Sequence, residues 1–139
     1  MTRYVAGVIL GARVDELNAL VKRGGSPTPS ELLEAVLTGA INQPVLFAVV
    51  MQMWSESITD PALGEVVQGL LGQMRAAMRD AVTPWARQQT PSEEQATQLA
   101  DRTSFILVAL AQGFITHTAM QGPLSPAEYI SGLRHLERP

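Results

Sequence analysis

The sequence contains no cysteine, and charged and aromatic residues are scarce. The absence of cysteine excludes a disulfide framework and every thiolate-based zinc, iron–sulfur or nucleophile motif. Charged residues make up 17% of the chain, against roughly 25% in an ordinary soluble domain, whereas hydrophobic residues make up 46%. Residues 1–139 suit one domain, which can bury a core without covalent cross-links. The low charge indicates that the chain hides surface against a partner or encloses an apolar pocket.

Charge and hydrophobic runs also exclude two classes of partner. The net charge is −3, and the basic residues are scattered, whereas direct nucleic-acid binding needs a clustered basic face. The apolar run over residues 4–12 is far shorter than the about 20 residues of a spanning helix, and no small-x-small cleavage site follows it. We therefore expect a cytoplasmic protein with no membrane segment.

Helix-start patterns recur along the chain. Residues 28–31, 90–93 and 125–128 all read hydroxyl, proline, any residue, glutamate, and residues 60–61 read Asp-Pro. In such a pattern the hydroxyl caps the helix, proline takes the first helical position, and glutamate closes a capping box. Four such starts in one short chain predict an all-helical fold.

Helix-stop patterns agree with these starts, because glycine follows apolar segments at residues 23–25 and 121–123. No sustained polar and apolar alternation predicts a strand. The sequence predicts an all-α bundle of about six helices with antiparallel neighbours, over residues 4–22, 29–42, 44–58, 61–88, 91–121 and 126–136. Pro84 should kink the fourth helix or end it early.

Two of the expected helices have surfaces that indicate contact with a second subunit. One stripe of 61–88 contains small residues, which lower helix propensity and are easiest to explain by close approach of another helix backbone. Alternatively, Gly69 and Gly72 of this stripe face solvent and are merely tolerated there. Within 91–121, only Gln112 interrupts an otherwise apolar or small run over residues 105–115. The candidates for a dimer interface are Gly69, Gly72, Ala76, Leu107, Leu110, Ala111, Phe114 and His117.

Residues able to carry catalysis are few. His117 and His135 lie on different expected helices with no carboxylate at metal-ligand spacing. Glu56 and Asp60 are four residues apart, but Asp60 is better explained as a helix cap. Neither a nucleophile–base set nor a glycine-rich phosphate loop is present. We expect no enzyme activity, no metal and no cofactor.

Methionine and aromatic residues gather on the central helices, a combination that suits the binding of varied hydrophobic small molecules. An ordinary core of such residues is the alternative. The pocket candidates, with two polar groups that could orient a ligand, are Phe47, Met51, Trp54, Met74, Met78, Trp85, Phe105, Gln112 and Thr116.

The order of four segments resembles a known family. These segments are WSESITDPAL at 54–63, MRAAM at 74–78, EEQATQLAD at 93–101 and LVALAQGF at 107–114. Together they look like the C-terminal domain of the tetracycline-repressor (TetR) family of transcriptional regulators, over about residues 30–121. The resemblance implies a helical domain that binds a small hydrophobic effector and forms a homodimer. It also implies that helices 61–88 and 91–121 of each subunit pair into a four-helix bundle.

One departure from the family pattern concerns DNA binding. Members carry an N-terminal helix-turn-helix domain, whereas residues 1–22 correspond to the helix that connects it to the effector domain. We therefore expect DNA binding only through a domain missing from this chain. The leading hypothesis is an effector-binding and dimerisation domain that allosterically controls a helix-turn-helix DNA-binding domain. The alternative is a purely structural helical homodimerisation module with no ligand.

Overall fold

A computed structural model describes Gly11, residues 15–41 and residues 45–137, apart from the side chains of residues 45 and 46. Within these residues every regular element is a helix, which confirms the all-α prediction. Residues 15–22 are helical, whereas most of the rest of the expected 4–22 helix, and Pro44, lie outside the described residues. The helices that follow are α2 (Pro29–Ala40), α3 (Val45–Ser57), α4 (Pro61–Gln89), α5 (Glu93–Gln121) and α6 (Pro126–Glu137).

The predicted caps account for two helix starts and need correction at a third. The Thr28 hydroxyl accepts a hydrogen bond from the backbone N–H of Glu31 at 3.3 Å, as a cap of α2 should. Asp60 caps α4. At α5 the cap is Ser92, not Thr90, because the Thr90 hydroxyl instead donates to the carbonyl of Ala86 and closes α4. The expected helix 91–121 therefore begins two residues later.

Proline at position 84 does not end α4, which continues to Gln89. Pro84 cannot donate to the carbonyl one turn back, but the neighbouring Thr83 hydroxyl donates to the carbonyl of Arg79 at 2.6 Å. Packing also holds this stretch in place, because Val82 and Ala86 on either side of Pro84 are fully buried. Tertiary burial thus outweighs the local cost of the proline.

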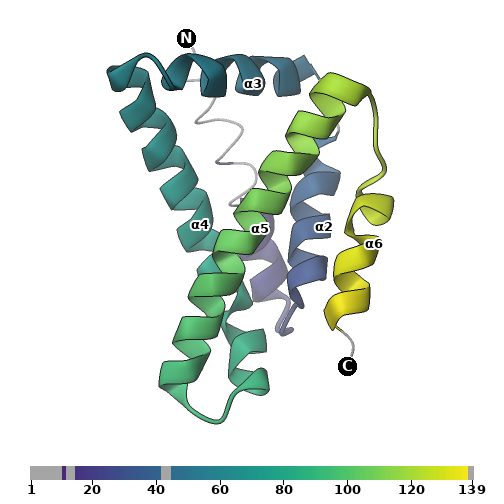
Figure 1. The fold of residues 1–139 in the computed structure, drawn as a ribbon. Helices are drawn as coiled ribbons and strands as arrows, with labels where there is room; N and C mark the ends of the chain where they lie inside the picture. Colours follow the sequence, from purple (N-terminus) through teal and green to yellow (C-terminus); the bar gives the residue numbers. More distant parts are fainter. Residues whose placement is uncertain (1–10, 12–14, 42–44, 138–139) are drawn as a thin grey trace.

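The helices are arranged around a long antiparallel pair, α4 and α5 (Figure 1). α3 lies across the ends of this pair, where α4 begins and α5 ends, and contacts both helices. α2 packs against α4 and α5, and α6 lies along α2. Gly122, at φ 109°, ends α5 and allows the chain to turn back toward α6.

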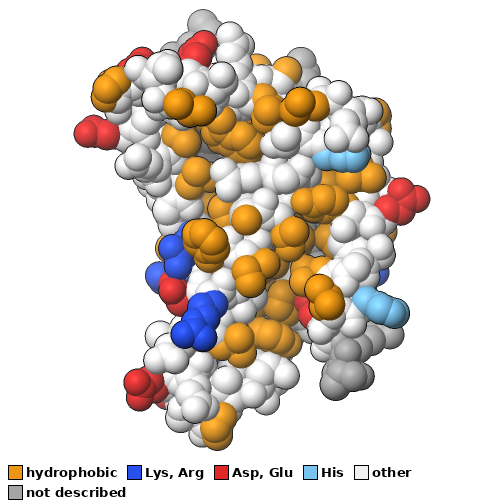
Figure 2. All heavy atoms as spheres, in the orientation of Figure 1, with side chains coloured by type: hydrophobic (Ala, Val, Ile, Leu, Met, Phe, Trp, Pro, Cys, Tyr) orange, Lys and Arg blue, Asp and Glu red, His pale blue; other side chains and the backbone are white. Residues whose placement is uncertain are grey.

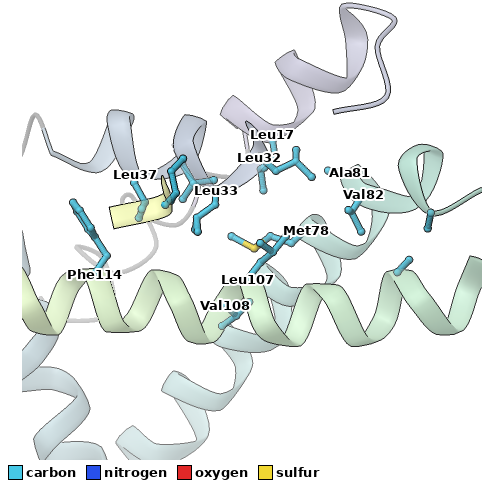
Figure 3. Packing of buried hydrophobic residues seen from close by; sticks show 14 of the residues in the cluster. Leu17, Leu32, Leu33, Leu37, Met78, Ala81, Val82, Leu107, Val108 and Phe114 are labelled. Atoms are coloured by element: carbon cyan, nitrogen blue, oxygen red, sulfur yellow. The ribbon is translucent and has the colours of Figure 1, made fainter. Parts of the chain in front are cut away.

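The larger of two hydrophobic clusters lies between the helices. Figure 3 shows the side chains of Leu33, Met78 and Leu107 converging from α2, α4 and α5. Leu17, from the helical residues 15–22, and Ile130, from α6, are also fully buried in this cluster. α2, α4, α5 and α6 each contribute at least one fully buried side chain to this cluster. α3 contributes Phe47, which is 4% exposed.

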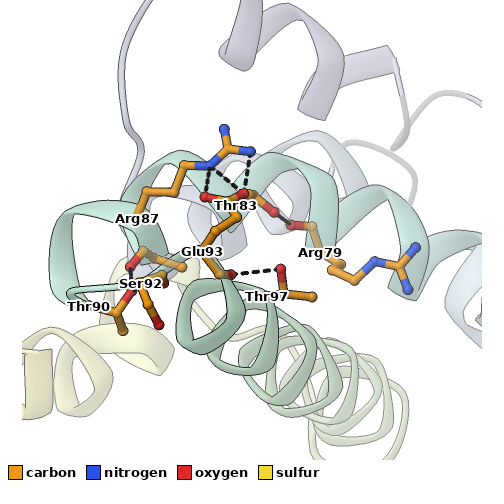
Figure 4. A network of polar contacts seen from close by, with 8 residues as sticks. Arg79, Thr83, Arg87, Thr90, Ser92, Glu93 and Thr97 are labelled. Atoms are coloured by element: carbon orange, nitrogen blue, oxygen red, sulfur yellow. Dashed lines mark hydrogen bonds and ion pairs between the residues drawn. The ribbon is translucent and has the colours of Figure 1, made fainter.

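The turn between α4 and α5 carries a network of polar contacts (Figure 4). The Arg87 guanidinium donates to the Glu93 carboxylate, with the shortest N–O distance at 2.8 Å. This hydrogen bond, with the positive charge of Arg87, holds the pKa of Glu93 below its ordinary value. The pair is exposed and joins the end of one helix to the start of the next.

Candidate functional site

The junction of α3 and α5 brings together Phe47, Met51 and Thr116, three of the predicted pocket residues. The half-buried Met51 places its Sδ atom 3.6 Å from the Thr116 hydroxyl oxygen, and that hydroxyl donates to the Gln112 carbonyl at 2.9 Å. Beside them, the Phe47 ring meets Phe114 edge to face, with centroids 6.2 Å apart. Apolar surface and a hydroxyl therefore adjoin at this junction.

The pocket candidates on α4 and the end of α3 lie in different environments. Met78 is fully buried in the main core, and the half-buried Met74 packs against that core. Trp54 is half-buried against a second, smaller cluster formed by Met53 and Val67. Leu71 packs against both clusters and thus links the two.

Trp85 lies at the other end of α4, apart from the other candidates, and lines a cavity of about 400 Å³. The surroundings are polar, and four of the lining residues are charged or carry an amide. The lining consists of Thr28, Ser30, Glu31, Trp85, Gln89, Arg134 and Glu137. Among the described residues, Trp85 therefore lines a polar cavity and does not share an apolar pocket with the other candidates.

Polar contacts between α6 and α2 close one side of this cavity. The Glu137 carboxylate accepts from the backbone N–H and the hydroxyl of Ser30, both at 2.7 Å. Arg134 makes an ion pair with Glu34. A carboxylate at a helix N-terminus is favourable because the terminal N–H groups carry partial positive charge. Sequence reasoning missed this contact, since no local pattern links residues 30 and 137.

The outer face of α5 is hydrophobic and exposed. Phe105, Ile106 and Met120 are 62%, 52% and 73% exposed. Figure 2 shows hydrophobic side chains gathered over α5 and between α5 and α6. Phe105 therefore lies on the surface, which corrects its assignment to a pocket. Ala109 and Gly113 are also exposed on this helix, between the larger side chains.

Other predicted interface residues on α5 lie inside the chain's own core. Leu107 and Phe114 are 1% and 0% exposed, so they cannot contact a partner, and their assignment to an interface is corrected. Leu110 and Ala111 are half-buried and pack against the core. His117 is half-buried near the end of the helix.

The small-residue stripe of α4 is open in the structure. Gly69 and Gly72 are exposed, and a Cβ atom added at either would meet nothing within 4 Å. Ala76 is half-buried. No other helix among the described residues comes within 4 Å of a Cβ atom added at either glycine.

Gly113 has a different role, which the sequence did not show. A Cβ atom there would lie 2.7 Å from the Tyr129 hydroxyl oxygen. That hydroxyl donates to the Leu110 carbonyl at 2.6 Å, and the Tyr129 ring meets Phe114 edge to face. Burial raises the pKa of Tyr129. The missing side chain of Gly113 thus admits the contact that joins α6 to α5.

By length and composition alone, α5 is apolar enough to cross a membrane, the one such helix in the described part of the chain. Core helices of proteins without membrane segments pass the same test. Ala100, Ser104 and Leu107 on one side of α5 are buried in the core. The opposite side of α5 is apolar and exposed. Helix length and composition do not distinguish a protein partner from a lipid on that side.

Comparison with known proteins gives one finding. Residues 29–137 match the family of BetI-type transcriptional repressors, C-terminal domain. The searches of curated proteins and of solved structures each give no match. The matched range spans all five helices from α2 to α6. The chain therefore belongs to the C-terminal domain family of BetI-type repressors, within the TetR-type regulators.

Proposed function

We propose that this chain is the effector-binding and dimerisation domain of a cytoplasmic transcriptional regulator. In this proposal a small hydrophobic ligand controls DNA binding by a helix-turn-helix domain of the same regulator. The family match supports a regulatory role of this kind. The observation that carries the proposal is the exposed apolar face of α5 on an otherwise well-packed helical domain.

A second copy of the chain is the partner proposed for this face. Monomeric proteins rarely expose large contiguous apolar patches, and such patches mark interaction sites. Phe105, Ile106 and Met120 lie on one helix with the small residue Ala109 between them, whereas the space beside Gly113 is taken by the Tyr129 hydroxyl. A two-fold interface pairs a patch with itself, so it needs both large side chains and spaces to receive them. The α5 face contains both.

The proposed ligand site is the α3–α5 junction. The half-buried Met51 supplies an adaptable apolar side chain there, and Trp54 on α3 and Met74 on α4 are further half-buried apolar side chains. The Thr116 hydroxyl, which donates to the backbone carbonyl of Gln112, supplies an oxygen that can accept a hydrogen bond from a ligand. Phe47 and Met78 are packed in the core rather than free to contact a ligand.

α5 would couple the two proposed sites. Its outer face carries Phe105 and Ile106, whereas Thr116, three turns later, contacts Met51 of α3. A ligand with higher affinity for one position of α3 relative to α5 would favour that position. The dimer arrangement that accompanies this position would then be more populated. The spacing of the DNA-binding heads would change with it.

A structural homodimerisation module with no ligand is the second candidate. The observation that favours it is the complete burial of Met78 and the near-complete burial of Phe47, both of which belong to the main hydrophobic core. In this case the half-buried residues around Met51 are simply the edge of that core.

Native mass spectrometry of freshly purified protein tests the proposal, since it reports the oligomer and any co-purified small molecule together. We expect a dimer of twice the 15.0 kDa chain mass. A chain that stays monomeric at micromolar concentration contradicts the proposed dimer.

Ligand binding is tested separately with the apolar dye 1-anilinonaphthalene-8-sulfonate. We expect M51W to fill the α3–α5 junction and to lower dye binding. The matched control is I58W, at a residue that is 84% exposed in the turn after α3. Equal dye binding by the two variants favours the structural module.

A further inference from the structure

The α4–α5 surface contains an ion pair assembled around an exposed aromatic ring. The guanidinium carbon of Arg75, on α4, lies 5.3 Å from the centroid of the Phe105 ring on α5. Arg75 Nη2 also donates to both carboxylate oxygens of Asp101 at 3.1 Å. Asp101 precedes Phe105 by one helical turn. One arginine thus joins two helices and holds the ring from one side.

The position of Arg75 strengthens its contact with the ring. Its Nε atom is buried and has no hydrogen-bond partner among the described residues. A cation over an aromatic face is worth more when it is partly removed from water. The salt bridge to Asp101 is itself half-exposed, so it contributes little to stability alone. Its main effect is to fix the guanidinium over Phe105.

We infer that Phe105 is the anchor of the homodimer interface and that Arg75, fixed by Asp101, is its positioning residue. This inference rests on the proposed dimer. Aromatic and arginine side chains dominate the residues that carry most binding energy at interfaces. A ring already held in one orientation also loses less conformational entropy when a partner covers it.

The neighbourhood of Phe105 fits a second copy of the chain. Ala109 lies one turn after Phe105 on α5, and Gly72 lies one turn before Arg75 on α4, with open space around it. In a two-fold interface these small residues can receive the Phe105 ring of the partner. The charge of Arg75, the cation over the ring, is paired with Asp101, so covering the ring does not bury an unpaired arginine charge.

The test is the dimer dissociation constant measured by sedimentation equilibrium. We expect F105A to raise it by about 30-fold. R75M, which keeps the aliphatic stem, should raise it by about fivefold, and R75K should restore part of the loss because the cation stays near the ring. The matched control is R79M, since Arg79 lies one turn further along α4 and pairs only with its neighbour Asp80 among the described residues.

A double variant separates a positioning role from a general structural one. If Arg75 acts through Phe105, R75M should have almost no further effect on the dissociation constant in the F105A background. Equal effects of R75M in both backgrounds overturn the positioning role. A wild-type chain that dimerises with an affinity unchanged by F105A overturns the anchor but leaves the proposed dimer standing. A wild-type chain that is monomeric, or that sediments with liposomes, overturns both.

Discussion

Replacement of Phe114 by alanine tests whether this residue belongs to the core or to a subunit interface. Phe114 is fully buried in α5. Its ring meets Phe47 at 6.2 Å and Tyr129 at 5.3 Å, both edge to face. F114A therefore removes a packed ring that joins α3, α5 and α6.

The expected loss of unfolding free energy is large. A buried Phe→Ala substitution costs about 3–5 kcal/mol through lost transfer energy and the cavity left behind. Each edge-to-face pair adds about 0.5–1.5 kcal/mol beyond buried area, which argues against the lower end of that range and supports a loss of at least about 4 kcal/mol. At about 3 °C per kcal/mol for a chain of this length, the melting temperature should fall by at least about 12 °C.

Urea unfolding followed by circular dichroism at two protein concentrations measures this loss. A core residue lowers stability by the same amount at both concentrations, whereas an interface residue acts mainly where the dimer forms. The control is I58A, because the Ile58 side chain is almost fully exposed. A loss below about 1 kcal/mol, or one confined to the higher concentration, would refute the core assignment.

Three further predictions concern single contacts. G113A should be less stable than G132A by about 2 kcal/mol in urea, because its Cβ meets the Tyr129 hydroxyl while Gly132 has open space around it; equal stability would contradict the close approach. E137Q should lose about 1 kcal/mol in the same assay, since it removes the negative charge at the N-terminus of α2, and an unchanged midpoint would argue against that contact. Glu93 has a lowered pKa, so its stabilising ion pair is present above the ordinary glutamate value of 4.5 and is lost as pH falls through the lower folded-state pKa. Wild type should therefore be the more stable protein at neutral pH, and its difference from E93Q should narrow toward pH 3; a constant difference would contradict this.

The helices could be predicted from the sequence because their ends carry local chemistry. Thr28 and Asp60 each accept hydrogen bonds from backbone N–H groups of the first turn that they cap, a contact set by neighbours in the chain. Glycine after α5 likewise ends that helix through its own backbone freedom. The start of α5 was misplaced because Thr90 and Ser92 both carry hydroxyls, and the end of α4 uses the first.

The site could be predicted only in part, because helical spacing shows which residues share a face but not what covers it. α5 is apolar on nearly all sides, so periodicity could not separate the exposed Ile106 from the buried Leu107 next to it. For the same reason, spacing alone assigns Phe105 to a pocket although its side chain is exposed. It assigns Phe114 to an interface although its side chain is fully buried. The contact between Glu137 and α2 depends on tertiary folding and leaves no trace in local sequence.

The central claim is that the exposed face of α5 meets the same face of a second chain. Because the chain has no cysteine, A109C introduces a single thiol in the middle of this face. A short bis-maleimide linker, which tolerates an offset of residue 109 from the two-fold axis, should convert A109C at micromolar concentration into a covalent dimer. I58C, exposed in the turn after α3, should stay monomeric under the same conditions. Failure of A109C to cross-link, or equal cross-linking of I58C, would contradict the account.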